Sequence, residues 1–354
     1  MKKVLIVDST PFGQAPYIKT YTDSFDKMGI PWDIFVWDKN QNLNDITYKD
    51  HIFTSYRIMH LKGKEKYYDF YKISRDILKI IKREGISHLV IVNSIWAILL
   101  YKCLRNYTNR FILDIRDYKI EKKTIIQFLL KDIINRSYCT FISSEGFQDF
   151  LPPSQHIHVI HNLDTNHMKI RVAEKVPTDI NKIKIGFVGY VRYDAPNRWL
   201  IKQLRNHSDT EIHYYGGFSR YCNFHKEKNL IGNNVFFHGP YNNDDKSEIY
   251  NDIDFINALY SQDYSSRIAL PNRIYDAAYY KKPIIASKGS FCGKIVSKYD
   301  MGFEVDFNEP DFYSHLISYI NNFNLIRFER GCNKFIEKIM EQQNSALNLI
   351  DKFI

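Results

Sequence analysis

Short apolar runs that alternate with stretches of helical period constrain this chain more than any other feature. In the first half the runs occupy residues 4–8, 32–37, 88–93, 110–115, 139–144 and 156–162. In the second half they occupy residues 184–189, 211–217, 234–239, 254–261, 283–288 and 302–306. Runs that are apolar at nearly every position predict strands buried on both faces, as in a parallel sheet covered by helices.

The two series of runs predict two domains. The pattern lapses between Leu163 and Lys182, which indicates a linker. We therefore expect an α/β chain with two doubly wound, Rossmann-like domains that face each other across a cleft. We expect an N-terminal domain at 1–165, a linker at 166–182 and a C-terminal domain at 183–325. A last helix at 326–354 is expected to pack back on the N-terminal domain.

The charge balance favours an anionic partner. The 354 residues carry a formal net charge of +9 at pH 7, and 44% of them are hydrophobic, which is enough to bury two cores. A loose basic stripe lies on a predicted helix, at Lys119, Lys122, Lys123 and Lys131. This stripe is either a solvated helix face or a contact with an anionic membrane surface. We expect no nucleic-acid partner.

The sequence also bears on the compartment. Its cysteines have neither CxxC spacing nor Cys/His spacing, which fits a reducing cytoplasm. The start, MKKVLIVDST, has too few apolar residues for a signal-peptide core. The apolar stretch at 88–101 is shorter than the roughly 20 residues that a membrane span needs. We expect a cytoplasmic protein that is not integral to a membrane.

Ligands of open parallel sheets bind beyond the carboxyl ends of the strands, so the residues that follow the runs are site candidates. Gly13 follows the first run and lies either in a plain turn or in a loop whose N–H groups approach a ligand. Arg116 and Asp117 form either a surface ion pair or a contact to an acceptor or a sugar. His161 and Asn162 are either hinge residues or ligand contacts.

The second series has candidates of its own. Arg192 places a guanidinium just past the strand that ends at Gly189, in reach of a bound phosphate. The loops at Gly217 and at His238 to Tyr241 end the next two strands, where such loops commonly turn around a flat base.

Several common patterns do not occur. The chain has no GxGxxG and no GxxxxGK[ST], so neither a nicotinamide cofactor nor a P-loop is indicated. It has no HExxH and no GxSxG to support hydrolytic chemistry. Asp252 and Asp254 have a spacing that suits a divalent metal, but they open a predicted strand instead of ending one. We therefore expect no metal site.

The segment LPNRIYDAAYYKKPIIASKGS at 270–290 carries the strongest site signal. Asn272 is a good N-cap for the predicted helix RIYDAAYYK. Arg273 adds a positive charge at the helix N-terminus, which is unfavourable unless an anion compensates. Asp276 stands at i+3 and is expected to share the face of Arg273. These residues suit a nucleoside diphosphate, with Arg273 on phosphate and Asp276 on the ribose diol; the alternative is an Arg–Asp pair on a solvated helix.

The order of elements and the segment PNRIYDAAYYKKPIIAS resemble GT-B glycosyltransferases of the family 4-like kind. In that family a Pro-Asn-Lys-hydrophobic-aromatic-Glu helix precedes a Gly-Lys-Pro-Val-Ile strand. The likeness covers nearly the whole chain in element order, and its specific motifs lie between residues 184 and 290. It implies that Asp276 holds the ribose, that Arg192 contacts the diphosphate and that the Gly13 loop faces the donor phosphates.

Two positions depart from the family. Asp276 stands where the family usually has Glu, and Ile268 stands where the family often has a second Glu for the donor sugar. Asp263 is the nearby acid that we consider as its substitute. The resemblance implies a retaining, metal-independent transfer in which Arg192, Arg273 and helix N-termini neutralise the leaving group.

We therefore expect a glycosyltransferase, cytoplasmic or peripheral at the inner face of the membrane, that acts in surface polysaccharide biosynthesis. It would use a UDP- or GDP-sugar as donor substrate, a glycan or lipid-linked acceptor, and no further cofactor. The alternatives are a nucleotide-sugar epimerase on the same frame, or a non-catalytic partner subunit, which Ile268 favours. The expected catalytic residues are Asp117, Arg192 and Arg273, and the expected donor-binding residues are Gly13, Gly189, Arg192, Gly217, His238, Tyr241, Asn272, Arg273 and Asp276.

Overall fold

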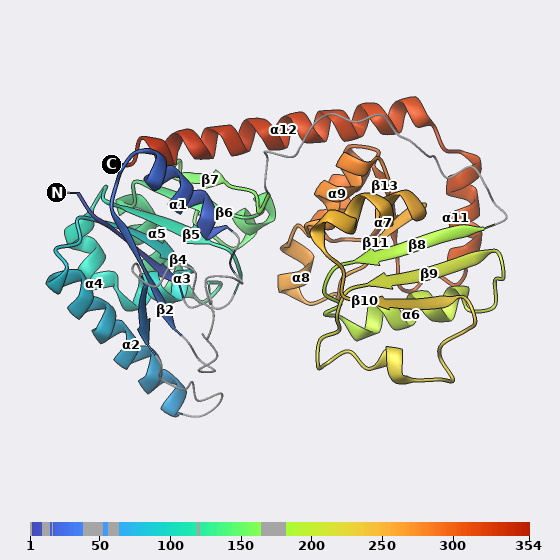
Figure 1. Cartoon of the computed structure of the whole chain (residues 1–354), viewed down its shortest axis with the longest axis horizontal. Coiled ribbons are helices and arrows are strands. Elements are labelled where there is room, and N and C mark those ends of the chain that lie inside the picture. The colour runs from blue at the N-terminus through green and yellow to red at the C-terminus, as the bar shows by residue number, and fades with distance from the viewer. Residues whose placement is uncertain are drawn as a thin grey trace. The chain divides into compact units, whose positions relative to one another are not determined.

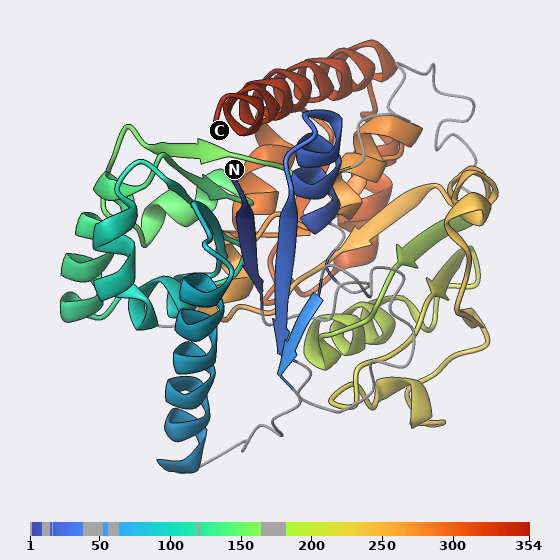
Figure 2. The same ribbon diagram turned by 60° about the vertical axis from the view of Figure 1, so that its left-hand side comes forward.

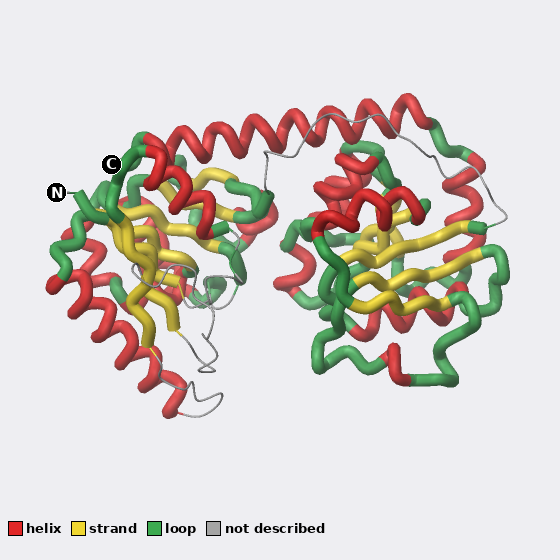
Figure 3. The backbone as a smooth tube through the Cα atoms, in the orientation of Figure 1, coloured by secondary structure: helices red, strands yellow, loops and turns green. Residues whose placement is uncertain are grey.

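The computed structural model describes residues 2–8, 15, 17–37, 52–55, 64–118, 121–163 and 182–354. The chain divides into two compact units (Figure 1; Figure 3). Unit 1 comprises Met1–Asn162 and Glu341–Ile354, and unit 2 comprises Leu163–Met340. The first change of unit lies close to the predicted boundary at residue 165, and most of the predicted linker lies outside the described residues.

Unit 1 is built on a parallel sheet that has seven strands within the described residues, in the order β3-β2-β1-β4-β5-β6-β7. The strands are β1 Val4–Asp8, β2 Trp32–Trp37, β3 Ile52–Ser55, β4 His88–Val92, β5 Phe111–Ile115, β6 Cys139–Ile142 and β7 Ile157–Val159. The α-helices are α1 Ile18–Lys27, α2 Lys64–Arg83, α3 Ser94–Leu99, α4 Tyr101–Leu104 and α5 Thr124–Arg136.

Unit 2 is built on a second parallel sheet, which has six strands in its described part and the order β10-β9-β8-β11-β12-β13. The strands are β8 Ile183–Val188, β9 Thr210–Tyr215, β10 Val235–Gly239, β11 Phe255–Ala258, β12 Ile284–Ser287 and β13 Gly302–Val305. The α-helices are α6 Asp194–Leu204, α7 Lys246–Asp252, α8 Tyr264–Ile268, α9 Arg273–Tyr280, α10 Phe291–Lys298, α11 Phe312–Asn321 and α12 Leu325–Asp351.

The prediction of two doubly wound α/β sheets is confirmed. Strands β1, β2, β4 and β5 are buried at every position, because both faces of the sheet are covered. That burial is the physical reason for the continuous apolar runs. The edge strand β10 differs, since only Val235 of its residues is buried.

The last helix, α12, does not lie on the N-terminal domain from residue 326 as predicted. It belongs to unit 2 up to Met340 and to unit 1 from Glu341. Its first half places Phe328 and Phe335 in the core of unit 2, which explains the difference. In unit 1 its end lies beside α1 (Figure 2), where Ile350 shares the core with Phe25.

None of the described helices combines the length and the apolar character needed to cross a membrane. All five cysteines lie in the described part of the chain and are free thiols.

Each sheet has one point where the strand order reverses. In unit 1 it lies between β1 and β4, and in unit 2 between β8 and β11. At such a point neighbouring connections leave the sheet in opposite directions, so a crevice opens beyond the carboxyl ends of the strands. The residues that end these strands are therefore the first candidates for a site in each unit.

Candidate active site

Glycines end the three strands on one side of the reversal in unit 2. Gly189 directly follows β8, Gly216 directly follows β9, and Gly239 is the last residue of β10. Their φ angles are 127°, 128° and 75°, in that order. A Cβ on Gly216 would lie 2.2 Å from the carbonyl oxygen of Gly189, so these two loops approach each other through bare backbone. Gly217 lies under the exposed side chain of Tyr190. A Cβ on Gly217 would lie 3.5 Å from the ring of Tyr190.

Arg273 lies on the other side of this reversal, at the start of α9. Its side chain is buried, and the residue is only 7% exposed. The guanidinium carbon lies 3.9 Å from the centre of the Phe187 ring on β8 and 5.5 Å from that of Tyr260, just after β11. Its Nη1 atom lies 3.6 Å from the position of a Cβ on Gly189. Arg273 thus lies at the point where the strand order reverses.

The described residues do not satisfy the hydrogen-bonding groups of the Arg273 guanidinium. Its Nε and Nη2 atoms are buried and have no hydrogen-bond partner among the described residues. A buried cation without a compensating charge costs several kcal/mol. Such a group points to an anionic ligand that supplies the missing acceptors.

Asp276 forms no ion pair with Arg273 among the described residues and has partners of its own. Its Oδ2 atom accepts a hydrogen bond of 2.7 Å from the hydroxyl of Tyr250 and one of 3.4 Å from Lys246, both on α7. Arg273 instead faces the ring of Phe187, because the first turn of α9 packs into the core of unit 2. The alternative of a solvated Arg–Asp pair is therefore wrong.

The helix start at Arg273 is confirmed, but Asn272 is not a side-chain cap. Its backbone is already helical, with φ −57° and ψ −27°, and its side chain makes no capping hydrogen bond. A capping side chain needs an extended residue at this position. The backbone closes the turn instead, since the carbonyl of Pro271 accepts from Ile274 N and that of Asn272 accepts from Tyr275 N.

Two more predicted residues lie near this point. Burial raises the pKa of Tyr260, and the positive charges of Arg273 and, less strongly, of Arg192 oppose that rise. Burial and the carboxylate of Asp276 raise the pKa of Tyr241, again against Arg273. Arg192 is exposed, and Tyr241 is half-buried. Arg192 lies shortly after the carboxyl end of β8, and Tyr241 lies shortly after that of β10.

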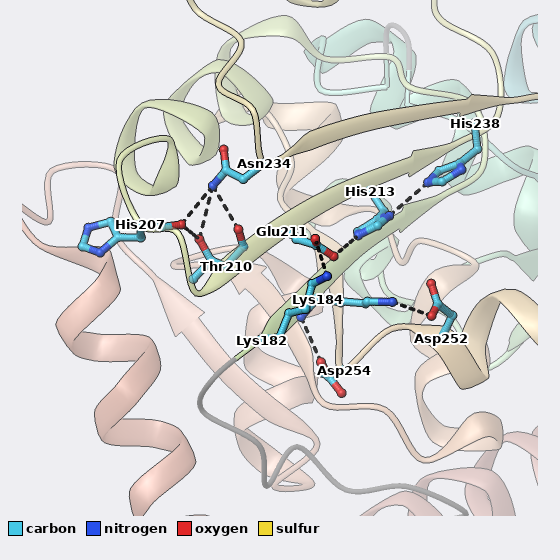
Figure 4. Close-up of polar contacts among 10 residues, drawn as sticks. All are labelled: Lys182, Lys184, His207, Thr210, Glu211, His213, Asn234, His238, Asp252 and Asp254. Atoms are coloured by element: carbon cyan, nitrogen blue, oxygen red, sulfur yellow. Dashed lines mark hydrogen bonds and ion pairs between the residues drawn. The ribbon is translucent and has the colours of Figure 1, made fainter.

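His238 packs along the sheet (Figure 4). Its Nε2 atom lies 3.0 Å from Nδ1 of His213, whose Nε2 lies 3.2 Å from a carboxylate oxygen of Glu211. Its ring stacks on Tyr215 at 4.1 Å. Burial lowers the pKa of both histidines, which favours their neutral forms.

Asp252 and Asp254, which were considered as metal ligands, both contact Lys184 (Figure 4). The Nζ atom of Lys184 lies 2.6 Å from Asp252, and its backbone N–H donates to Asp254 at 2.9 Å. In the described part of the chain, no group of three or more His, Cys, Asp or Glu side chains is placed to hold a metal ion.

Asp263 has a structural role that the sequence did not reveal. It caps α8 by accepting from Ser266 N at 3.0 Å, and it also accepts from the hydroxyls of Ser265 and Ser266. Partial burial opposes ionisation, but these hydrogen bonds outweigh it and lower the pKa of Asp263 to about 2. Ile268 is buried at the other end of α8. The carboxylate of Asp263 is thus already used at the helix N-terminus.

In unit 1 the first of the two alternatives for Arg116 and Asp117, a surface ion pair between them, is wrong. Arg116 pairs with Asp114, 2.7 Å away, and both side chains are buried. Asp114 also accepts a 2.7 Å hydrogen bond from Tyr21, while Tyr17 lies under the Arg116 guanidinium at 4.5 Å. Asp117 is exposed. The sequence did not identify Asp114, because it lies inside an apolar strand and looks like part of it.

A second residue that the sequence missed is Asn93, directly after β4. Its φ is 74°, which is strained for a residue with a side chain. It is buried, and its Oδ1 atom has no partner among the described residues. The strained Asn93 and the buried pair at Asp114 both lie at the carboxyl edge of the sheet in unit 1, near its reversal point.

Two further predicted residues belong to the N-terminal half of the chain. Gly13 lies outside the described residues. His161 follows β7 and is held by α12, with its backbone N–H donating to Gln343 at 2.9 Å and its Nε2 lying 2.9 Å from Gln342. It thus lies where the chain leaves unit 1, as the hinge alternative requires.

No protein-family model and no curated protein sequence matches the chain, but solved structures match nearly its whole length. Sucrose-phosphate synthase from Thermosynechococcus elongatus matches with a TM-score of 0.69 and 13% identity over 99% of this chain and 97% of that one. The lipopolysaccharide outer core galactosyltransferase WaaB matches with 0.69 and 15% over 100% of both chains. Anabaena HepE in complex with UDP-glucose matches with 0.64 and 14%, over 99% of this chain and 100% of that one.

The likeness agrees with the architecture of both units. Each has a parallel, doubly wound sheet, and the reversal point of unit 2 carries a buried arginine with two nitrogens that have no partner among the described residues. The chain therefore has the GT-B fold that is found in these glycosyltransferases.

Proposed function

We propose that this protein is a glycosyltransferase that transfers a sugar from a nucleotide-sugar donor, without a metal ion. The observation that carries the proposal is the state of Arg273, a buried guanidinium with two unsatisfied nitrogens at the reversal point of unit 2. A diphosphate supplies the negative charge and the acceptors that this group lacks. The structure of HepE, which matches this chain, is a complex with UDP-glucose.

In this proposal the donor diphosphate lies against Arg273 and the bare backbone of Gly189. Arg192, exposed at the same edge, contacts the phosphates from the solvent side. Asp276 accepts hydrogen bonds from the ribose diol, and Tyr250 and Lys246 hold its carboxylate in place. The glycine loop at Gly217 provides room for the flat base.

The same residues account for the chemistry. The acceptor hydroxyl oxygen forms a bond to the anomeric carbon while the bond between the sugar and the diphosphate breaks. Negative charge develops on the leaving oxygen, and the diphosphate takes up the proton of the acceptor hydroxyl. Arg273 and Arg192 stabilise this charge, and Arg273 does so in a site of low dielectric where its effect is largest. No protein nucleophile and no Mg²⁺ are then required. We also propose that Asp117, which is exposed just after β5, contacts the acceptor.

The acceptor and the setting are further parts of the proposal. Polar groups at the carboxyl edge of unit 1, among them Asn93 and Asp114, suit an acceptor rich in hydroxyl groups. A glycan or lipid-linked acceptor in surface polysaccharide assembly, used in the cytoplasm, fits this chemistry. WaaB, which also matches the chain, is a lipopolysaccharide outer core galactosyltransferase.

Donor turnover tests the proposal. The purified protein is incubated with a panel of UDP- and GDP-sugars, without and with glycan acceptors, and products are followed by mass spectrometry. We expect one nucleotide sugar to release its nucleoside diphosphate and to extend an acceptor, with retention at the anomeric carbon by NMR. An epimerised donor formed without acceptor, or no turnover of any donor, would contradict the proposal.

A further inference from the structure

The buried arginine of unit 1, Arg116, resembles Arg273 in one respect and differs from it in another. Like Arg273, Arg116 has its guanidinium over an aromatic ring, that of Tyr17, at 4.5 Å. Its Nη1 atom is buried and has no hydrogen-bond partner among the described residues. Its charge, however, is compensated, because its Nε atom lies 2.7 Å from Asp114 and its Nη2 atom donates to Asp114 at 2.8 Å. Arg116 therefore lacks a hydrogen-bond acceptor but not a negative charge.

The charges around Arg116 do not favour an anionic ligand. Asp8, at the end of β1, is buried and accepts a 2.9 Å hydrogen bond from Tyr17, whose ring lies under Arg116. The carboxylate of Glu121 is also buried, and it accepts a hydrogen bond from Ser94, the first residue of α3. A carboxylate or phosphate brought to this edge would meet like charges and would find its cation already paired. An uncharged ligand avoids both costs.

Asn93 lacks the opposite kind of hydrogen-bonding partner. The residue is 6% exposed, and its buried Oδ1 atom has no partner among the described residues. An amide oxygen only accepts, so this atom lacks a donor. The backbone N–H of Asn93 donates to the carbonyl of Asp114 at 2.7 Å, and Val92 pairs with Asp114 in the sheet. Asp114 thus holds Asn93 through its backbone and Arg116 through its carboxylate, at the same end of β4 and β5.

The backbone of Asn93 is not explained by its place in the fold. Its φ and ψ angles are 74° and 142°, close to a region that essentially only glycine occupies. A glycine would leave β4 at this point without strain, and the side chain of Asn93 makes no capping hydrogen bond to α3. Backbone strain of this kind is commonly found where a side chain contacts a ligand. The strain and the unpaired oxygen thus point to a ligand at Asn93.

We infer that Asn93 and Arg116 bind hydroxyl groups of an uncharged sugar and thereby select a neutral acceptor over an acidic one. A hydroxyl group both donates and accepts, so one hexose can donate to Oδ1 of Asn93 and accept from Nη1 of Arg116. An ionised carboxylate or phosphate only accepts, so it leaves Asn93 unsatisfied. This inference rests on the proposed function, in which the acceptor lies at the carboxyl edge of unit 1, and it adds the chemical class of sugar that this edge selects.

Sugar binding in the absence of a donor tests this inference. The probes are the methyl glycosides of glucose, galactose and mannose, each compared with the methyl glycoside of its uronic acid, in which a carboxylate replaces the hydroxymethyl group. Ligand-observed NMR with the full chain gives the dissociation constants. We expect at least one methyl hexoside to bind at least about tenfold more tightly than its uronide, because the carboxylate meets like charges and leaves a buried acceptor unpaired.

Asn93→Gly tests the contribution of the asparagine side chain. Glycine suits the backbone angles at this position, so the variant should fold with about wild-type stability. It should bind the preferred methyl hexoside about tenfold more weakly, because a hydrogen bond to a buried group is lost. The matched control is Asn109→Gly in the same unit, since Asn109 also has a positive φ, of 59°, but is exposed. It should bind the hexoside as the wild type does. A purely structural role of Asn93 would change stability and leave the hexoside affinity of the folded variant unchanged.

UDP affinity, measured for the same variants, separates this inference from the proposed function. Both variants should keep the wild-type UDP affinity, since neither residue belongs to the donor site in unit 2. Hexoside binding as described, without turnover of any donor, would remove the proposed transfer and leave the sugar site in place.

Three outcomes would overturn the inference. The first is that no methyl hexoside binds, and the second is that a uronide binds as tightly as its hexoside or more tightly. The third is that Asn93→Gly binds the hexoside as the wild type does. The first two use the wild type alone, so they decide the matter whatever the stability of the variant.

Discussion

The guanidinium of Arg273 lies 3.9 Å from the ring of Phe187, while its Nε and Nη2 atoms have no partner among the described residues. The ring face attracts the cation and fixes the plane of the guanidinium, but it offers no hydrogen-bond acceptor. The arginine is therefore oriented and yet unsatisfied. A group in this state is ready to bind an anion with little rearrangement, and this relationship is the basis of the proposed donor site.

Asp276→Asn should weaken UDP binding by about tenfold, because a carboxylate accepts hydrogen bonds more strongly than an amide does. It should also reduce the preference for UDP over 2′-deoxy-UDP, since the proposed contact is to the ribose diol. Isothermal titration calorimetry with both nucleotides measures these effects. Asp252→Asn, which removes an acid paired with Lys184 in the same unit, is the control and should bind both nucleotides as the wild type does.

Gly216→Ala should lower the free energy of unfolding by more than about 2 kcal/mol, because the new Cβ meets a backbone oxygen 2.2 Å away at a φ of 128°. Gly239→Ala is the matched comparison, since its φ is 75° but its Cβ meets nothing within 4 Å. It should lower the free energy of unfolding by about 1 kcal/mol. Urea unfolding of both variants measures the difference. An equal decrease in the free energy of unfolding for both variants would show that the close approach of Gly216 to Gly189 does not affect stability.

His213 should make stability depend on pH. Burial lowers its pKa in the folded protein, so the unfolded chain binds a proton at a higher pH than the folded one. The free energy of unfolding should therefore fall as the pH decreases below about 6.5, by up to about 1.4 kcal/mol per pH unit. Glu211 opposes the shift, while His238 and Lys184 add to it. His213→Phe should flatten this dependence in urea unfolding between about pH 7.5 and pH 5.5. An unchanged slope would mean that His213 does not titrate as stated.

The sequence predicted the fold well where one physical cause acts alone. Strands buried on both faces must be apolar throughout, so strands such as β1 Val4–Asp8 and β8 Ile183–Val188 were found directly. β3 Ile52–Ser55 was missed because its short sequence IFTS is half polar. The periodicity of α12 identified a helix, but a pattern on one helix does not reveal which unit it contacts.

The site was only partly predictable for a related reason. The sequence indicated that Arg273 begins a helix, but its burial depends on Phe187 and Tyr260, which lie far away in sequence. The partners of Asp276 come from α7, about one helix and one strand earlier in the chain. Asn93 gave no signal, since a strained φ depends on how the chain leaves β4. The burial of Arg273, the partners of Asp276 and the φ angle of Asn93 all depend on tertiary contacts, which patterns in a single sequence do not reveal.

The most direct measurement is UDP binding by Arg273→Met, compared with the free energy of unfolding of the same variant. Methionine fills the space beside Phe187 but removes an unsatisfied buried charge, so stability should be unchanged or higher. UDP affinity should fall at least about fiftyfold, because charge-assisted hydrogen bonds to the diphosphate are lost.

Arg198→Met is the control for that measurement. Arg198 is paired with Asp194 at 2.9 Å and with Glu227 on the surface of unit 2. Its loss should lower stability slightly and leave UDP affinity unchanged. Retained stability with lost UDP binding in Arg273→Met is the predicted result, and wild-type UDP affinity in Arg273→Met would contradict the account.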